Sequence, residues 1–387
     1  PDPSAFMEAS SPAAAVAAPA AIACGGEHTL ALRPDGAAFS SGACGLGWNR
    51  LQAVFPGLLS WRRAPIPEPV AAVVGGSYHS LALTKTGKLF AWGCGTFTDG
   101  RLDGAIPALG QRSRATETLD PALVDVGGAC VVEAAAGAYH SVARTADGRV
   151  FTFGAAQLGQ LGRPVGAQVD GAGLPVSADP GEAALTAGDL AVKVGAAFYN
   201  TFAICKSGVV LCAGENQYGQ CGAGMANLAL LTRVNELKGH DVTAVTGGYC
   251  HTLALTRAGF VVTLGCGDDG QRGASTDATS NVVRLPNRKA VSIAAGANHS
   301  LALADDGSVW GFGSNEYGQL GGGDDEPVFS PRRVPLAQKC VAVSAGYAHS
   351  VLSLADGSAV ALGRGENGQL ANGTDKDRVQ ATPCDKL

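Results

Sequence analysis

The chain has 387 residues, of which 46% are hydrophobic and 16% are charged, and its formal net charge is −5. Nucleic acids and anionic membranes attract basic surfaces, so this net negative charge argues against direct binding of either. The sequence contains no run of about 18 apolar residues, so no membrane span is predicted. The eleven cysteines are odd in number and lack metal-ligand spacing, so we expect reduced, mostly buried thiols in a reducing intracellular compartment, with cytoplasm, nucleus and organelle interior not distinguished.

Residues 1–19 are rich in proline, alanine and serine. A segment of this composition cannot bury enough apolar surface to fold by itself, so the sequence predicts a disordered or tethered arm. A regular pattern begins at residue 20, and we expect residues 20–387 to form a single domain.

The regular pattern is an internal repeat that occurs seven times. Its reference positions are His28, His79, His140, Asn200, His251, His299 and His349. Eight residues after each of them stands a glycine: Gly36, Gly87, Gly148, Gly208, Gly259, Gly307 and Gly357. Fourteen residues after each stands another: Gly42, Gly93, Gly154, Gly214, Gly265, Gly313 and Gly363. Chance does not align fourteen glycines in this way, so the sequence predicts a repeat architecture.

Each unit contains four predicted strands. The first precedes a glycine, as in AVSIAAG at 290–296, and the second alternates apolar residues, as at Leu301 and Leu303. The third ends at the later glycine, as in SVWGFG at 308–313. The fourth often carries proline, as in SPRRVPL at 330–336, which suits an outer edge strand. Turns that join antiparallel strands are predicted at Asp35-Gly36, Asp147-Gly148, Asp306-Gly307 and Asp356-Gly357.

Three segments break the repeat. Two units carry roughly ten extra residues after the third strand, at 98–120 and 163–189, and insertions at the same place in a unit are expected on one face of the assembly. In the first unit the corresponding segment, 47–65, is strongly apolar and lacks the GQLG sequence that ends other units.

Seven such units in series predict an all-β fold, a seven-bladed β-propeller of four-stranded antiparallel blades. The last segment, VQATPCDKL at 379–387, matches a fourth strand, and the strands that would follow it in a blade lie at 20–32. We therefore expect the ring to be closed by a blade shared between the N- and C-terminal strands.

The repeat resembles that of the regulator of chromosome condensation family. The segments that carry the resemblance are GAYHSVARTADGRVFTFGAAQLGQLG, GANHSLALADDGSVWGFGSNEYGQLG and GYAHSVLSLADGSAVALGRGENGQL. The resemblance covers about residues 20–387 and implies the propeller fold. It does not select a function, because the family includes guanine-nucleotide exchange factors, a plant ultraviolet photoreceptor, ubiquitin ligases, mitochondrial ribosome-assembly proteins and cytoskeletal scaffolds.

The repeated histidines are interpreted as structural. Asn200 replaces one of them, and asparagine can take over a hydrogen bond but cannot act as a general base. We expect each to hydrogen-bond the backbone at a seam between blades. The GQLG segments lack the lysine of a phosphate loop, and acidic pairs such as Asp268-Asp269 are interpreted as solvated loop charges, with calcium binding as the weaker alternative. The sequence thus predicts no enzyme, no catalytic residue, no metal and no cofactor.

Two functions from the family are weighed against a third. No tryptophan stands one or two residues before a reference position, which argues against the photoreceptor. An exchange factor for a small GTPase stays open, because the insertions at 98–120 and 163–189 could reach a partner, although no exchange residue matches by motif. The preferred hypothesis is a non-catalytic protein–protein interaction scaffold or regulatory subunit of a larger assembly.

The apolar segment 47–65 favours that hypothesis, because tryptophan and arginine are common interface anchors. An alternative, that the segment packs against its own blade, stays open. The candidate partner-binding residues are Trp48, Phe55, Leu58, Leu59, Trp61, Arg62 and Arg63.

Overall fold

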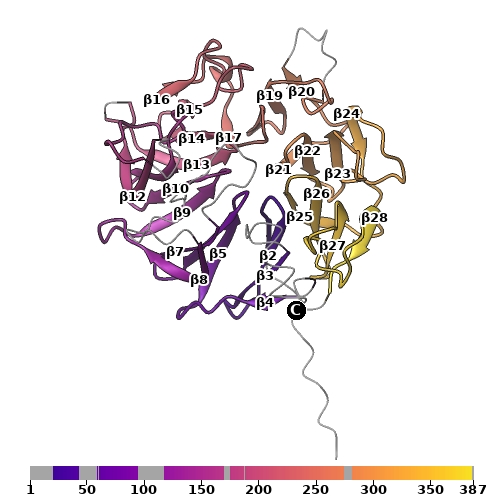
Figure 1. The fold of residues 1–387 in the computed structure, drawn as a ribbon. Coiled ribbons are helices and arrows are strands. Elements are labelled where there is room, and N and C mark those ends of the chain that lie inside the picture. The colour runs from indigo at the N-terminus through magenta and orange to yellow at the C-terminus, as the bar shows by residue number, and fades with distance from the viewer. Residues whose placement is uncertain are drawn as a thin grey trace, which may run out of the picture.

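A computed structural model describes residues 21–42, 59, 61–94, 117–169, 175–186, 188–273 and 281–385. Seven four-stranded antiparallel sheets follow one another along the chain and stand around a central axis (Figure 1). The predicted seven-bladed all-β propeller is therefore confirmed. Within the described residues the helical structure is a three-residue 3-10 turn, η1 (Asn235–Leu237), and no helix there is long and apolar enough to cross a membrane.

The strands run from the axis outward in each blade. Blades one and two contain β1 (Ala21–Cys24), β2 (His28–Leu32), β3 (Ala38–Gly42), β4 (Arg62–Arg63), β5 (Val70–Gly75), β6 (His79–Thr84), β7 (Leu89–Cys94) and β8 (Glu117–Val124). Blades three and four contain β9 (Val131–Ala136), β10 (His140–Thr145), β11 (Val150–Ala155), β12 (Val176–Ala183), β13 (Ala191–Ala197), β14 (Asn200–Cys205), β15 (Val210–Gly214) and β16 (Leu228–Arg233). Blades five to seven contain β17 (Val242–Gly247), β18 (His251–Thr256), β19 (Val261–Gly265), β20 (Val282–Val283), β21 (Ala290–Ala295), β22 (His299–Ala304), β23 (Val309–Gly313), β24 (Val328–Arg333), β25 (Cys340–Ala345), β26 (His349–Leu354), β27 (Ala359–Gly363) and β28 (Arg378–Pro383).

The two invariant glycines of each unit are required by the backbone. Gly307, in the turn between β22 and β23, has a φ of 84°, a left-handed conformation that side chains with a Cβ rarely adopt. Gly313, at the end of β23, has a φ of 109°, and a Cβ there would lie 2.5 Å from the carbonyl oxygen of Asn298. The first glycine thus makes the hairpin turn, and the second allows the third strand to pass close to the start of the second.

The core lies between the blades. All six residues of β22 are buried, and Leu301 and Leu303 pack in one cluster with Phe312, Leu352 and Val360 of the same and the next blade. Burying a leucine or phenylalanine side chain contributes about 1.5–3 kcal/mol. Because the middle strands are buried on both faces, each blade depends on its two neighbours for its core.

The predicted shared blade is wrong. Each sheet takes its four strands from one continuous stretch, so β1 belongs with β2–β4 and β28 with β25–β27. The seventh seam is closed by side-by-side packing, in which the amide of Tyr347 donates to the carbonyl of Gly26 at 3.0 Å. The same kind of backbone bond joins every pair of neighbouring blades, with lengths of 2.8–3.2 Å: Gly26 to Gly76, Ser77 to Gly137, Ala138 to Phe198, Phe198 to Gly248, Tyr249 to Ala297 and Ala297 to Tyr347. The ring is therefore closed by seven backbone hydrogen bonds, one at each seam between neighbouring blades, and not by a shared blade.

The two insertions contain ordered strands. β8 and β12 are each eight residues long; β8 begins within the last residues of the predicted insertion 98–120, and β12 lies inside the predicted insertion 163–189. An isolated bridge joins Val169 to Pro175. Residues 117–120 and 176–183 of the insertions therefore belong to the fourth strand of their blade.

Deleting residues 378–387 is expected to lower the melting temperature of the whole domain by several degrees. The deletion removes β28 and leaves β27 as an unpaired edge, and it also removes the Asp385 carbonyl that accepts a hydrogen bond from the Trp61 indole at 3.1 Å. Thermal unfolding followed by circular dichroism measures the effect. Deleting only residues 386 and 387 is the control, and equal melting temperatures for the two truncations would contradict the prediction.

Candidate functional site

The repeated histidines link one blade to the next. Each lies at the start of the second strand, is 0–1% exposed, and its Nε2 lies within hydrogen-bond distance of a hydroxyl in the following blade. The pairs are His28–Ser80 at 3.0 Å, His79–Ser141 at 2.8 Å, His140–Thr201 at 3.0 Å, His251–Ser300 at 3.0 Å, His299–Ser350 at 3.0 Å and His349–Thr29 at 3.3 Å. The last pair crosses the seam between the seventh blade and the first. The seam position was predicted correctly, but the partner is a side-chain hydroxyl rather than the backbone.

The hydroxyl groups fix the protonation of the histidines. Ser300 Oγ donates to the Gln271 carbonyl at 2.8 Å and Ser350 Oγ to the Gln319 carbonyl at 2.7 Å. Because that hydroxyl proton is committed, the oxygen must accept from Nε2–H of the histidine. The Nδ1 atoms of the six histidines are buried and have no hydrogen-bond partner. Thr29 and Thr201 donate in the same way to the Gln369 and Gln160 carbonyls. The pairing of a histidine with a hydroxyl of the next blade is called the seam relay below, and in these four seams it needs a neutral imidazole.

Burial gives the same result for the charge. Removal from water disfavours the imidazolium and lowers the pKa of His28 and His140 to about 4. Burial lowers the pKa of the other four histidines to about 3: His79, His251, His299 and His349. Neighbouring histidines add to this effect in His79, His299 and His349. The six side chains are thus uncharged at neutral pH, and their Nε2 atoms are paired with hydroxyl groups in the seams.

One seam lacks the relay. Asn200 stands in for histidine, and its Nδ2 donates within its own blade to the Glu215 carbonyl at 2.6 Å. Across this seam Thr252 Oγ1 still donates to the Gln220 carbonyl at 2.8 Å. In the six other blades a glycine stands three residues before the histidine, and in the fourth blade that position holds Ala197. The two changes belong together, because a Cβ at the glycine would overlap the imidazole ring.

Replacing His299 with alanine is expected to lower the free energy of unfolding by about 1–3 kcal/mol, the usual cost of leaving a buried polar partner unsatisfied. The change removes the hydrogen bond to Ser350 Oγ. Urea unfolding measures the loss. His240→Ala, in the loop between η1 and β17, is the control, and equal effects of the two substitutions would contradict a role in the seam.

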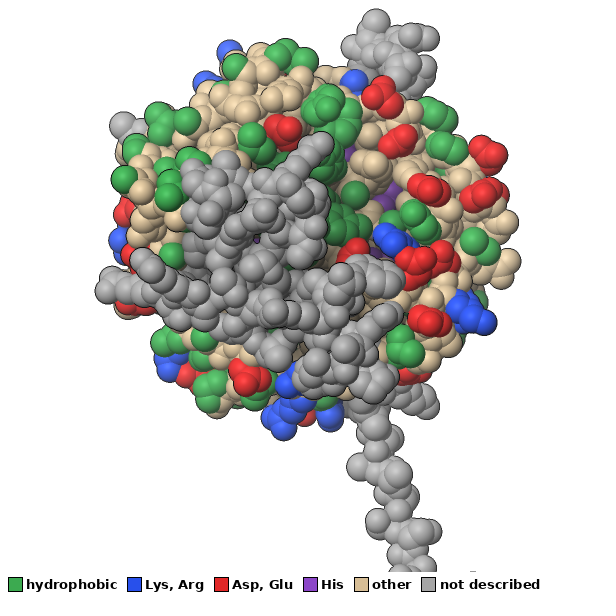
Figure 2. Space-filling model, in the orientation of Figure 1, with side chains coloured by type: hydrophobic (Ala, Val, Ile, Leu, Met, Phe, Trp, Pro, Cys, Tyr) green, Lys and Arg blue, Asp and Glu red, His purple; other side chains and the backbone are tan. Residues whose placement is uncertain are grey.

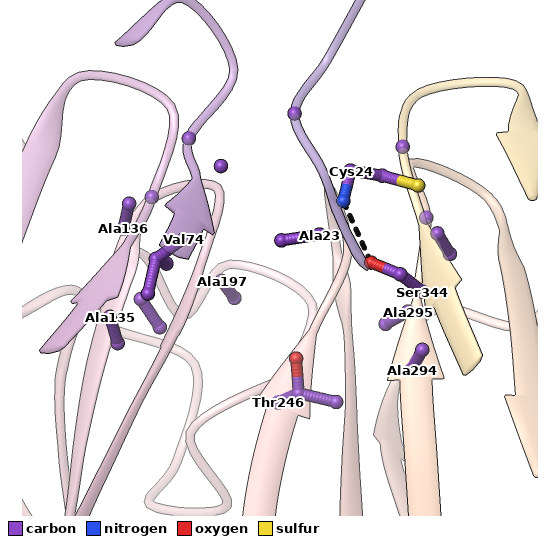
Figure 3. Close-up of a pocket in the computed structure, with 18 of the residues that line it drawn as sticks. Ala23, Cys24, Val74, Ala135, Ala136, Ala197, Thr246, Ala294, Ala295 and Ser344 are labelled. Carbon is purple, nitrogen blue, oxygen red and sulfur yellow. Dashed lines mark hydrogen bonds between the residues drawn. The ribbon is translucent and has the colours of Figure 1, made fainter. Parts of the chain in front are cut away.

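The innermost strands line a narrow central channel. Its volume is about 290 Å³ and its wall consists mainly of glycine and alanine, with small side chains such as Ala23, Ala135 and Ala294 (Figure 3). The amide of Cys24 donates to Ser344 Oγ at 2.8 Å across the seam between the first and last blades. The wall offers little polar side-chain chemistry that could orient a substrate.

Six aromatic side chains form a closed ring at one mouth of the channel. They stand one or two residues before reference positions. Figure 2 shows hydrophobic side chains near the centre of the propeller. Successive ring centroids lie 5.0–6.3 Å apart in the order Tyr78, Tyr139, Tyr199, Tyr249, Phe198, Tyr347 and back to Tyr78. Aromatic pairs contribute about 0.5–1.5 kcal/mol each beyond the area they bury. The aromatic ring therefore ties five blades together, and Tyr249, 43% exposed, presents part of it to solvent.

Two carboxyl groups near this mouth have raised pKa values. Burial raises the pKa of Glu27, and Glu366 adds to the effect while Arg364 opposes it. Burial also raises the pKa of Glu215, and its Oε2 has no hydrogen-bond partner. Neither carboxyl lies beside a histidine that could share a proton, because the histidines are enclosed in the seams. Among the described residues, no group of three or more His, Cys, Asp or Glu could hold a metal ion.

The candidate partner-binding residues are only partly described. Trp48, Phe55 and Leu58 lie outside the described residues, and Leu59 is half-buried. Trp61 is half-buried and bonds the Asp385 carbonyl. Arg62 and Arg63 are exposed in β4, which pairs with β3 at Ser40 and Phe39. At Trp61 the described part of the segment thus lies beside the end of the last blade, and the role of the segment in binding stays a prediction.

The cysteines differ from expectation. Cys212 is joined to Cys221 and Cys250 to Cys266 by disulfides, so the prediction of reduced thiols is wrong for these four. Buried thiols are found, as predicted, at Cys24, Cys205 and Cys340. The pairing could not be read from spacing because Cys212 and Cys250 are brought to their partners by the strand-to-loop turn of each blade. The predicted compartment stays a prediction.

Two features of the site were missed although the sequence contains their signal. A serine or threonine follows every reference position: Thr29, Ser80, Ser141, Thr201, Thr252, Ser300 and Ser350. The alignment that revealed the histidines would also have revealed their partners. The aromatic residues were compared only with tryptophan, so their gathering at one mouth of the channel was not expected.

A family model described as RCC1-like domain matches residues 7–352. Over 276 residues the chain is 33% identical to the human E3 ubiquitin-protein ligase HERC2. The aligned stretch covers 69% of this chain and 5% of HERC2. Over 274 residues the chain is 28% identical to the ultraviolet-B receptor UVR8 of Arabidopsis thaliana. That aligned stretch covers 68% of this chain and 57% of the receptor. The chain therefore spans less than two thirds of these relatives.

The fold is also similar to that of a solved structure, Prp20p of Saccharomyces cerevisiae. The TM-score is 0.73 at 21% identity, over 96% of this chain and 87% of that one. At this identity the likeness supports the propeller fold alone.

Proposed function

The chain belongs to the RCC1-like domain family, and on that premise we propose that it is a non-catalytic protein–protein interaction scaffold or regulatory subunit of a larger assembly. The family supplies a propeller with a regulatory or binding role. The finer assignment, to a scaffold, rests on what the side chains of this chain do.

The observation that carries the proposal is the seam relay. The repeated polar side chains that could serve as acid, base or metal ligand are buried and hydrogen-bonded between blades, as His299 is to Ser350. General acid–base catalysis needs a titratable group within reach of a substrate. Recognition then falls to loops and rims, where partners can dock on a rigid ring.

The proposed binding surface is the segment 47–65 together with the face that carries the insertions. Arg62 and Arg63 are exposed on the rim of the first blade. We propose Trp48, Phe55, Leu58, Leu59 and Trp61 as apolar anchors beside these two cations, because aromatic and arginine side chains dominate interface energies.

The alternative is a guanine-nucleotide exchange factor for a small GTPase. The structure of Prp20p is titled for its binding to Gsp1p and histones, which is a property of that protein. The exchange-factor alternative is supported here by the two insertions at 98–120 and 163–189, which follow the third strand of adjacent blades in the sequence.

Affinity purification of the full chain followed by mass spectrometry tests both functions. A scaffold is expected to bring down a stable set of subunits whose recovery does not depend on added nucleotide. An exchange factor binds its GTPase most tightly when the nucleotide is absent, so enrichment of one GTPase by nucleotide removal, reversed by adding GDP, would replace the scaffold proposal.

Replacing Trp48 and Trp61 together by alanine is expected to weaken capture of that set at least about tenfold, because each truncation removes a large aromatic side chain proposed to contact the partner. The matched control is Trp61→Phe, which keeps a large ring but removes the hydrogen bond to Asp385. Melting temperatures are measured for both. A loss of stability in the double variant with capture intact would show that the segment belongs to the fold, and the two insertions would become the better candidates.

A further inference from the structure

Within the described part of the chain, the outer strand of each blade is the terminal strand of its sheet, and most of these edges are protected. β4 and β20 are only two residues long. The other five outer strands are six or eight residues long: β8, β12, β16, β24 and β28. Proteins commonly block such edges with proline, charge or short length, because a bare edge accepts a further strand.

The five longer edges share one irregularity, which allows them to be compared residue by residue. In β24, Val328 pairs with Gly313 and Arg332 with Gly311, so that three residues, 329–331, face a single residue of β23. The same arrangement occurs in the other four. The last residue of the three is Pro121, Pro180, Leu231, Pro331 or Ala381 in blades two, three, four, six and seven.

Only β16 among these five carries no proline. β28 has Ala381 at the shared position, but Pro383 follows two residues later. β16 reads Leu-Ala-Leu-Leu-Thr-Arg, and it is the terminal strand of its sheet. The blade-four edge, residues 228–233, therefore lacks the proline that its counterparts carry.

One position of the blade-four edge differs in the same direction, although apolar side chains are exposed elsewhere on other outer strands, at Leu123, Phe329 and Val379. The middle residue of the three is polar in the other blades: Asp120, Asp179, Ser330 and Gln380. In blade four it is Leu230, which is 55% exposed, and Met225, three residues before the strand, is 64% exposed. An exposed apolar side chain beside a bare backbone edge is typical of a strand-docking site.

The backbone direction fits such a site. The amide of Val234, just after β16, donates inward to the Val210 carbonyl at 2.9 Å. Amides alternate sides along an antiparallel strand, so the amide of Arg233 points away from the blade. Three other blades have proline, which has no amide hydrogen, at the position of Leu231. The pairing with the third strand therefore does not require an amide hydrogen bond from this position. Outward donors are thus available where a partner strand would lie.

We propose that the blade-four edge binds an extended segment of a protein partner, which adds a fifth strand to the blade (Figure 1). The segment presents an apolar side chain to Leu230 and an acidic one to Arg233, the only charged residue of β16. The inference rests on the proposed scaffold function and specifies how one partner is held.

A second copy of this chain fits the edge less well. In an antiparallel pair of two β16 strands, Arg233 of one copy would meet Leu228 of the other. That end of the strand is covered by a loop of the third blade, because a Cβ on Gly159 would lie 2.5 Å from the Leu228 carbonyl oxygen. Only the end that carries Leu230 and Arg233 is open to an added strand.

The test uses a fluorescent synthetic peptide that alternates threonine and valine and ends in glutamate, with the same peptide N-methylated at alternate residues as a backbone control. Fluorescence anisotropy is expected to show binding of the first peptide only. Leu230→Asp, which copies blades two and three, and Leu231→Pro, which copies blades two, three and six, are each expected to weaken binding at least about tenfold. Leu231 is partly buried, so Leu230→Asp serves if the proline variant does not fold.

Three results would overturn the proposal. The N-methylated peptide binds as tightly as the unmethylated one, the unmethylated peptide does not bind the wild type, or both folded variants bind it as tightly as the wild type does. Sedimentation at increasing protein concentration provides a further outcome: a dimer abolished by Leu230→Asp would mean that the occupant is a second copy, contrary to the proposal. Subunit capture by the two variants distinguishes failure of the edge inference from failure of the proposed scaffold function. If the peptide does not bind but the variants and the wild type capture the same subunits, only the edge inference fails.

Discussion

Lowering the pH from 7.5 to 5 is expected to unfold the ring. The six relay histidines have pKa values of about 3 or 4 when folded, against about 6.5 in an unfolded chain. The unfolded state therefore takes up protons first as the pH falls. The stabilisation is complete above pH 6.5, is lost progressively below it, and continues to fall until the folded pKa values are reached.

The expected size of the effect is large. At pH 5 each histidine costs about 2 kcal/mol, and six of them cost on the order of 10 kcal/mol, which is comparable to the whole stability of a typical domain. Glu27 and Glu215 act in the opposite direction, because their pKa values are raised by burial and their protonation favours the folded state. Two such groups do not offset six histidines.

Urea unfolding at intervals between pH 7.5 and 5 measures the loss of stability. His299→Asn, which copies the fourth blade, is expected to make the dependence on pH shallower by one proton, although it lowers the stability at pH 7.5. His240→Gln, outside the relay, is the control for the substitution itself. A free energy of unfolding that stays constant down to pH 5 would rule out neutral buried histidines as a main determinant of stability.

Replacing Gly346 with alanine is expected to prevent the ring from closing. A Cβ at this position would lie 2.1 Å from His349 Cε1 and 2.3 Å from the carbonyl oxygen of Gly25, in the first blade. The second neighbour is backbone and cannot move aside without opening the seam between the last and first blades. We expect a loss of at least about 3 kcal/mol, above the common range for overpacking, or no folded protein.

The matched control is Gly166→Ala. An added Cβ there meets no atom within 4 Å, so the substitution is expected to leave the melting temperature within a few degrees of the wild type. Comparing the soluble yields and thermal transitions of the two variants separates a steric effect at the seam from a general intolerance of glycine replacement. Folding of Gly346→Ala with an unchanged melting temperature would contradict the close approach of the two blades.

The sequence alone determined the number of blades, the order of the strands within them and the position of the hairpin turns. These features are local: a glycine such as Gly307 marks a turn because its backbone conformation excludes side chains, whatever lies around it. The alternation at Leu301 and Leu303 marks a strand for the same kind of reason. The sequence also placed the histidines at the seams, because seven equivalent positions imply seven equivalent environments.

Only the tertiary structure decided how the ring closes and what the repeated residues bind. The outer strand at 378–383 and the inner strands at 21–32 have patterns that would suit a shared blade, and the sequence does not say which sheet each strand joins. That choice depends on the sum of many contacts between residues far apart in the chain, such as Tyr347 with Gly26 and His349 with Thr29. The disulfides and the bare edge of β16 were hidden for the same reason: pairing and exposure are properties of neighbours in space, which a pattern along the chain constrains but does not specify.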